Sequence, residues 1–133
     1  MPARWQVRCY FSPDGIDQIH AWYDEQSYKV QGKFLSRLKA LMQLDLSEWK
    51  LPLFRWLHSE CVPLGEVRFE VQKVQHRPLG YRGPGPNVFT LTFCATEQSD
   101  HFVPRNACAI ALSRMTEIER NPGQCHACWL ALE

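Results

Sequence analysis

The segment Gly83-Pro84-Gly85-Pro86-Asn87 constrains the fold of this 133-residue chain more than any other stretch. Two glycines alternate with two prolines in it, so the backbone has little freedom except to turn. Residues 76–82 precede the turn, and the apolar run 88–93 follows it. Two extended segments joined by so short a connection predict an antiparallel β-hairpin.

A further strand is expected before the hairpin. Apolar residues at 67, 69 and 71 alternate with charged residues at 66, 68 and 70, which indicates one buried and one charged face. Pro78 lies in the first arm of the hairpin, and proline donates no backbone hydrogen bond. That arm is therefore expected at a sheet edge, or with a bulge at Pro78.

The remaining pattern predicts an α+β fold. Residues 5–11 alternate as a strand, two helical patterns follow, and Pro104 opens a helix that ends before Asn121. The expected element order is β-α-α-β-β-β-α, with the helices packed on an antiparallel sheet. One domain over residues 1–122 and a C-terminal tail over 123–133 are expected.

Composition places further bounds on the chain. The formal net charge is +1, so any nucleic-acid binding must come from a local patch. No apolar run approaches the length of a membrane span, and the first residues lack the apolar segment of a signal peptide. A cytoplasmic protein is expected, with no membrane contact.

Six cysteines, at positions 9, 61, 94, 108, 125 and 128, are expected to be free thiols in a reducing cytoplasm. Cys125-His126-Ala127-Cys128 has the spacing of half a zinc site, but no second pair of ligands with suitable spacing exists. We therefore expect no metal and no cofactor. His58 and His101 are isolated beside expected loops, where a plain surface role is anticipated.

Three short motifs, in this order, resemble the RelE/ParE superfamily of bacterial toxins, and the HigB-type and phage-derived members in particular. They are Gly65-Glu66-Val67-Arg68, the partial match from His76 to Tyr81, and Pro104 followed by Ala111 and Arg114. The resemblance spans roughly residues 5–120. It implies a RelE-like fold with the element order given above.

The resemblance also implies a function, that of the toxin in a type II toxin–antitoxin system. Such a toxin would act as a ribosome-associated, metal-independent endoribonuclease on mRNA, and a cognate antitoxin protein would neutralise it. Homo-oligomers would form through the antitoxin complex. One departure stands out, because Ala95-Thr96-Glu97 occupies the place where many members carry a lysine pair.

Four residues are the candidate catalytic groups. Arg68 and Arg77 lie on consecutive expected strands and suit charge stabilisation on a phosphorane. Tyr81 shares the Arg77 face and would stack on a base or donate a proton. His76 suits acid–base exchange but falls on the opposite face unless Pro78 marks a bulge. On this reading Arg77→Ala abolishes toxicity without disturbing the fold.

Candidate RNA-binding residues lie in two places. Lys29, Lys33 and Arg37 recur at four-residue steps on the second helix, in a stretch without acids, and would track RNA phosphates. Lys73 and Arg82, near the hairpin, would assist. Two simpler interpretations remain open. The helix cations would form only a solvated helix face, and the charged strand residues would form only cross-strand ion pairs. A non-enzymatic, ParE-like inhibitor or a phage-derived interaction protein is the alternative function.

Overall fold

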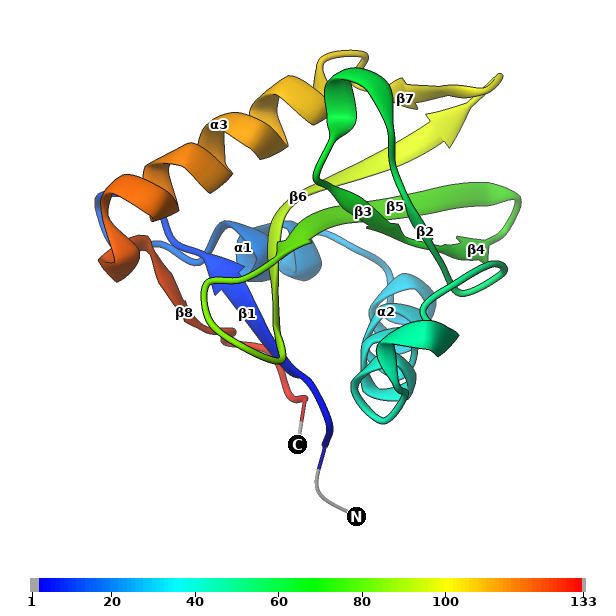
Figure 1. The fold of residues 1–133 in the computed structure, drawn as a ribbon. Coiled ribbons are helices and arrows are strands. Elements are labelled where there is room, and N and C mark those ends of the chain that lie inside the picture. Colours follow the sequence, from blue (N-terminus) through cyan, green and yellow to red (C-terminus); the bar gives the residue numbers. More distant parts are fainter. Residues whose placement is uncertain (1–2, 133) are drawn as a thin grey trace.

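The computed structural model describes residues 3–132, which form an α+β fold (Figure 1). Its helices are α1 (Gln18–Asp24), α2 (Tyr28–Met42) and α3 (Ala107–Arg120), with short 3-10 turns η1 (Leu46–Glu48), η2 (Ser59–Cys61) and η3 (Pro122–Gln124). Its strands are β1 (Gln6–Tyr10), β2 (Phe54–Trp56), β3 (Gly65–Val67), β4 (Phe69–Val71), β5 (Val74–Arg82), β6 (Val88–Gln98), β7 (His101–Val103) and β8 (Cys125–Ala127).

The sheet is mixed and has eight strands in the described part of the chain. Its order is β2-β3-β5-β6-β1-β8, with β4 paired to β5 and β7 paired to β6. β1 runs parallel to β6, although the other pairs are antiparallel. The prediction of a small, RelE-like antiparallel sheet is therefore wrong. The three-residue strands β2, β7 and β8 are too short to show an alternation pattern in the sequence.

The predicted hairpin is confirmed, since β5 and β6 pair along most of their length. Pro78 acts differently from expectation. β3 and β4 both pair with β5 in one register, and they are separated opposite Pro78, which has no N–H to donate. The Arg68 amide donates to the Leu53 carbonyl, at 3.0 Å, which continues the register of the β2–β3 pair. Pro78 is thus in an interior strand, and the register shift falls between Leu79 and Gly80.

Helices cover both faces of the sheet (Figure 1). α1 and α2 lie over one face, where Phe34 of α2 packs in a core with Phe54 and Phe89. α3 lies over the other face, above Leu79 and Tyr81 of β5. Each face therefore has its own hydrophobic core.

The C-terminal segment belongs to the sheet. β8 pairs antiparallel with β1, and Leu130 is buried in the core beneath α1 and α2. Asp17, 1% exposed, caps α1 through the His20 amide and accepts a second hydrogen bond from the Trp129 amide, at 2.8 Å. Residues 123–132, expected as a tail, thus complete the domain.

Four of the six cysteines are paired. Disulfides join Cys9 of β1 to Cys128, and Cys61 of η2 to Cys108 of α3. Cys94 and Cys125 are free. The prediction of six free thiols is therefore wrong. Both bridges join segments far apart in the sequence, so spacing alone gave no signal of them.

Within residues 3–132, no helix is both long and apolar enough to cross a membrane. In the same range, no group of three or more histidine, cysteine or acidic side chains is placed to hold a metal ion.

Candidate phosphate-binding site

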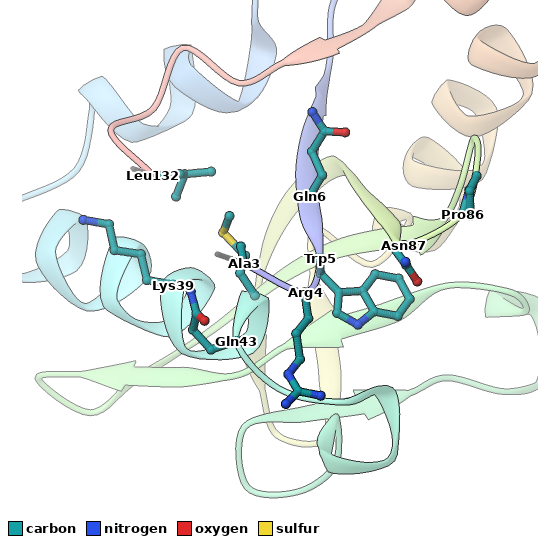
Figure 2. A pocket seen from close by; sticks show the side chains of 10 residues that line it. Ala3, Arg4, Trp5, Gln6, Lys39, Gln43, Pro86, Asn87 and Leu132 are labelled. Carbon is teal, nitrogen blue, oxygen red and sulfur yellow. The ribbon is translucent and has the colours of Figure 1, made fainter. Parts of the chain in front are cut away.

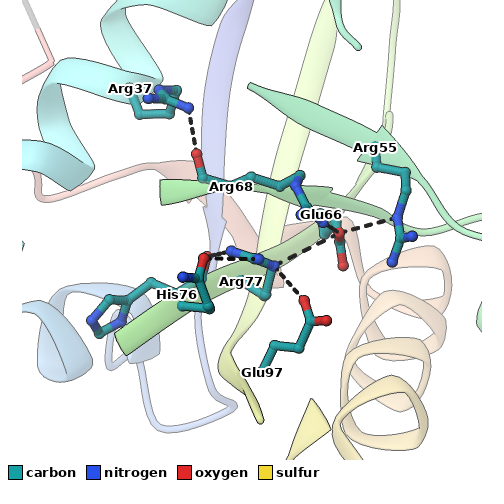
Figure 3. Close-up of polar contacts among 8 residues, drawn as sticks. Arg37, Arg55, Glu66, Arg68, His76, Arg77 and Glu97 are labelled. Carbon is teal, nitrogen blue, oxygen red and sulfur yellow. Dashed lines mark hydrogen bonds and ion pairs between the residues drawn. The ribbon is translucent and has the colours of Figure 1, made fainter. Parts of the chain in front are cut away.

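A buried carboxylate surrounded by arginines forms the centre of the candidate site (Figure 3). Glu66 of β3 is 0% exposed. Its Oε2 lies 3.2 Å from Nε of Arg55 on β2 and 3.8 Å from Nε of Arg77 on β5, and it accepts a hydrogen bond from Arg68. Arg77 Nε also donates to Glu97 of β6, at 2.8 Å. We call these five residues the Glu66 cluster.

The cluster has a simple electrostatic origin. A carboxylate removed from water requires compensating charge and hydrogen bonds, and here three guanidinium groups from two strands and the β3–β4 junction supply them. Two carboxylates, Glu66 and Glu97, face three arginines, so the cluster carries a net positive charge. The structure thus brings Arg68 and Arg77 together, as the sequence predicted, but through a shared acid.

Arg77 is held more tightly than expected. Its side chain is 4% exposed. Besides the Glu97 contact, its terminal nitrogens donate to the His76 carbonyl at 2.8 Å and to Gln75 Oε1 at 3.1 Å. Arg77 therefore has a supporting role in the site, and little of its side chain is open to a ligand. Arg77→Ala would disturb the sheet, contrary to expectation, and is a poor test of function.

A pocket of about 490 Å³ lies between α2 and the sheet, and four cations line it. They are Lys33 and Arg37 of α2 together with Arg68 and Arg77. We call this the cationic pocket. Glu70, also in its wall, is the one acidic side chain among the described residues that line it. Glu66 and Glu97 compensate Arg68 and Arg77, so the local positive charge of the pocket comes chiefly from Lys33 and Arg37.

Three of these cations keep free donors. Lys33 Nζ makes one hydrogen bond, to the Glu70 carbonyl at 3.2 Å, and Arg37 donates to the Arg68 carbonyl. Arg68 is 23% exposed and uses one nitrogen on Glu66. Burial lowers the pKa of Arg37 from its usual value, yet a guanidinium remains charged at neutral pH. These anchored cations can bind the oxygens of a phosphodiester.

Tyr81 and His76 lie away from the cationic pocket. Tyr81 is 3% exposed beneath α3, and burial, followed by nearby Cys125 and Glu119, raises the pKa of its phenol. It can therefore neither stack on an RNA base nor exchange a proton with one. His76 is on the face of β5 opposite to Arg77, where its ring stacks on Phe69 with ring centroids 5.0 Å apart. Burial and Arg77 lower the pKa of its imidazole, which is thus a core residue.

The other expected RNA-binding residues are dispersed. Lys73 lies in the exposed turn between β4 and β5, where its φ is 69°, and not on the strand face shared with Arg77. Arg82 lies over the Trp5 ring, 5.7 Å from its centroid. Lys29 is exposed on α2 and lies outside the pocket lined by Lys33 and Arg37.

Three cluster residues were missed as site candidates. Glu66 was expected on a charged sheet face and is buried instead. Arg55 lies in a connector with no regular pattern, and Glu97 was noted only as the replacement for a lysine. Neither position carries a local sequence signal, because both depend on pairing with strands distant in sequence. The one local indication of a charged cluster was the pair of opposite charges, Glu66 and Arg68, on either side of Val67.

Another pocket, of about 680 Å³, lies between the start of β1 and the end of α2 (Figure 2). Arg4 and Lys39 are its charged residues, and Arg4 is paired with Asp45. No acidic or histidine side chain among residues 3–132 lines it. It therefore offers no acid–base pair for catalysis.

No protein-family model, no curated protein and no solved structure matches this chain. The resemblance to RelE/ParE toxins accordingly remains a prediction from the short sequence motifs.

Proposed function

We propose that this protein binds the phosphodiester backbone of RNA in the cationic pocket and acts as an endoribonuclease toxin. The observation that carries the proposal is the meeting of two separate sequence features in one pocket. Lys33 and Arg37 come from the helix stripe, and Arg68 and Arg77 come from the sheet.

The chemistry of the pocket fits RNA better than a small neutral ligand. Single-stranded nucleic acid binds to positively charged grooves that follow its backbone. Arginine donors also stabilise the extra negative charge on phosphorus during cleavage, and they do so best when held in place beforehand. The Glu66 cluster provides this support, because it holds Arg55, Arg68 and Arg77 against one buried carboxylate.

The proposal includes partners and a place of action. The substrate would be mRNA on the ribosome, in the cytoplasm, and a cognate antitoxin protein would cover the cationic pocket. An acidic antitoxin segment would complement its charge. Assembly of toxin copies would then follow from antitoxin binding.

One observation favours a second candidate, a non-enzymatic inhibitor. Arg77 is buried and its donors are engaged, and among the described residues no histidine lines the cationic pocket. A surface that holds an acidic protein segment needs no acid–base group. In that case the pocket would bind a protein target, and RNA would compete weakly or not at all.

Removing the pocket charges should weaken RNA binding in a salt-dependent way. With three phosphate-contacting cations, the logarithm of the association constant for a single strand should fall with log salt at a slope of about −2. The double variant Lys33→Ala/Arg37→Ala should reduce that slope to about −0.7. Fluorescence anisotropy of a labelled RNA oligonucleotide, measured between low and moderate salt, gives both slopes.

Lys39→Ala is the matched control, since Lys39 is on the same helix but lines the pocket between β1 and α2 instead. It should leave the slope unchanged. An unchanged slope in the double variant, with its melting temperature intact, would show that RNA does not bind in the cationic pocket.

A further inference from the structure

A second pocket, of about 520 Å³, lies on the α3 side of the sheet beside the Glu66 cluster. Its walls come from η2, β7 and the first turn of α3, which lie together in Figure 1. The disulfide Cys61–Cys108 forms part of the wall and ties η2 to α3. We call this the histidine pocket, because His58 and His101 both line it.

Two arginines and a helix start give this pocket anion-binding groups. Arg55 lines it, and its Nε is held on Glu66, while neither terminal nitrogen makes a hydrogen bond within residues 3–132. Arg105 is exposed and makes no ion pair within residues 3–132. Asn106 is the N-cap residue of α3, and its side chain makes no capping hydrogen bond. The amides in the first turn of α3 are therefore not capped by Asn106 and can donate to an anion.

The position of His101 suits a proton acceptor. Its Nδ1 lies 3.1 Å from the Ser99 carbonyl oxygen, which can only accept a hydrogen bond. The neutral ring therefore carries its proton on Nδ1 and presents Nε2 as an acceptor. His101 is half-buried and His58 is exposed, so both rings are accessible from the pocket.

The two pockets are joined by one carboxylate. Glu66 Oε2 contacts Arg55, which lines the histidine pocket, and Arg68 and Arg77, which line the cationic pocket. Figure 3 shows Arg55 and Arg68 on two sides of Glu66. A strand of RNA bound along this row of arginines would pass from one pocket into the other.

We propose that the histidine pocket is where RNA is cut, with His101 as general base and His58 as general acid; this rests on the proposed function. His101 Nε2 takes the proton of a 2′-hydroxyl, and the 2′-oxygen forms a bond to phosphorus. The P–O5′ bond breaks, and the 5′-oxygen leaves with a proton from protonated His58. The products are a 2′,3′-cyclic phosphate and a 5′-hydroxyl, no further reactant is consumed, and solvent exchange restores both rings.

The charges of the two pockets predict that one pocket determines RNA binding and the other determines cleavage. The histidine pocket contains Glu60 and Asp100 as well as Arg55 and Arg105, so it is nearly neutral. Binding strength should therefore depend on the cationic pocket, and the rate of cleavage on the two histidines. This separation distinguishes the inference from the proposed function.

The test uses the purified chain and a synthetic mRNA, free and bound to ribosomes. His101→Ala and His58→Ala should each lower the single-turnover cleavage rate by about 100-fold or more. Neither should change the affinity for a 2′-deoxy analogue that cannot be cut. Added imidazole should restore part of the rate of His101→Ala. His126→Ala is the control, because His126 is exposed on β8, at the other edge of the sheet.

Each outcome bears on the inference. Full cleavage by both histidine variants would overturn it and leave the proposed function standing. Binding without cleavage by the unmodified chain would overturn both the inference and the enzymatic part of the proposed function. If His101→Ala unfolds, His101→Gln replaces it, and cleavage by this folded variant at the unmodified rate would likewise overturn the role of His101.

Discussion

Glu66→Gln should lower the free energy of unfolding by about 3 kcal/mol, because it removes the buried anion that three arginines share. The substitution keeps the size of the side chain. Glu66 Oε1 has no hydrogen-bond partner within the described residues, so the new amide group can take its place without breaking a contact. The change therefore isolates the charge. Arg68 should contribute most to the effect, since it donates directly to Glu66 and is 23% exposed, whereas Arg55 is 44% exposed and Arg77 keeps Glu97 as its nearer anion.

Urea unfolding at neutral pH measures this effect, and the melting temperature should fall by roughly 10 °C. Glu70→Gln is a matched control, because Glu70 is an exposed carboxylate on the neighbouring strand β4. It should change the stability by no more than about 0.5 kcal/mol. Equal stability of the two variants would show that the Glu66 charge does not hold the cluster together.

Cys9→Ser/Cys128→Ser should destabilise the protein by about 4–5 kcal/mol, because the bridge closes a long loop in the unfolded chain. The two cysteines are 119 positions apart in the sequence. The bridge also fixes the segment after β8 against β1, where Leu130 completes the core. Thermal unfolding with and without a reductant measures the contribution.

In the double variant a reductant should cause only the smaller further loss that comes from Cys61–Cys108, across 47 positions. A reductant that leaves the unmodified protein unchanged would contradict the account of both bridges. The bridges also bear on the place of action, since a reducing cytoplasm opens most disulfides. The stability of a protein that acts in the cytoplasm would then depend on packing alone, without the two bridges.

The local features of the fold were predictable from the sequence, and the long-range ones were not. The β5–β6 hairpin follows from a turn of alternating glycine and proline. The break at Arg68 follows from Pro78, but it becomes visible only once β3 and β4 are known to pair with the same strand. The parallel pairing of β1 with β6 joins segments about 80 residues apart, which no local pattern encodes.

For the site, too, local features were predictable from the sequence and long-range ones were not. Lys33 and Arg37 were recognisable from helical spacing, and Arg68 from strand alternation. Tyr81 does share a face with Arg77, yet α3 covers that part of the face. His58 and His101 were expected to have no role, because nothing in their own neighbourhoods showed that η2, β7 and α3 enclose one pocket.

Mapping mRNA ends in bacterial cells that express this chain tests the central claim most directly. The account predicts new, discrete 5′ ends within coding regions soon after induction, together with growth arrest. Lys33→Ala/Arg37→Ala should reduce both effects, and Lys39→Ala should reduce neither. Growth arrest with unchanged mRNA ends and with DNA damage would contradict the account and support a non-enzymatic inhibitor.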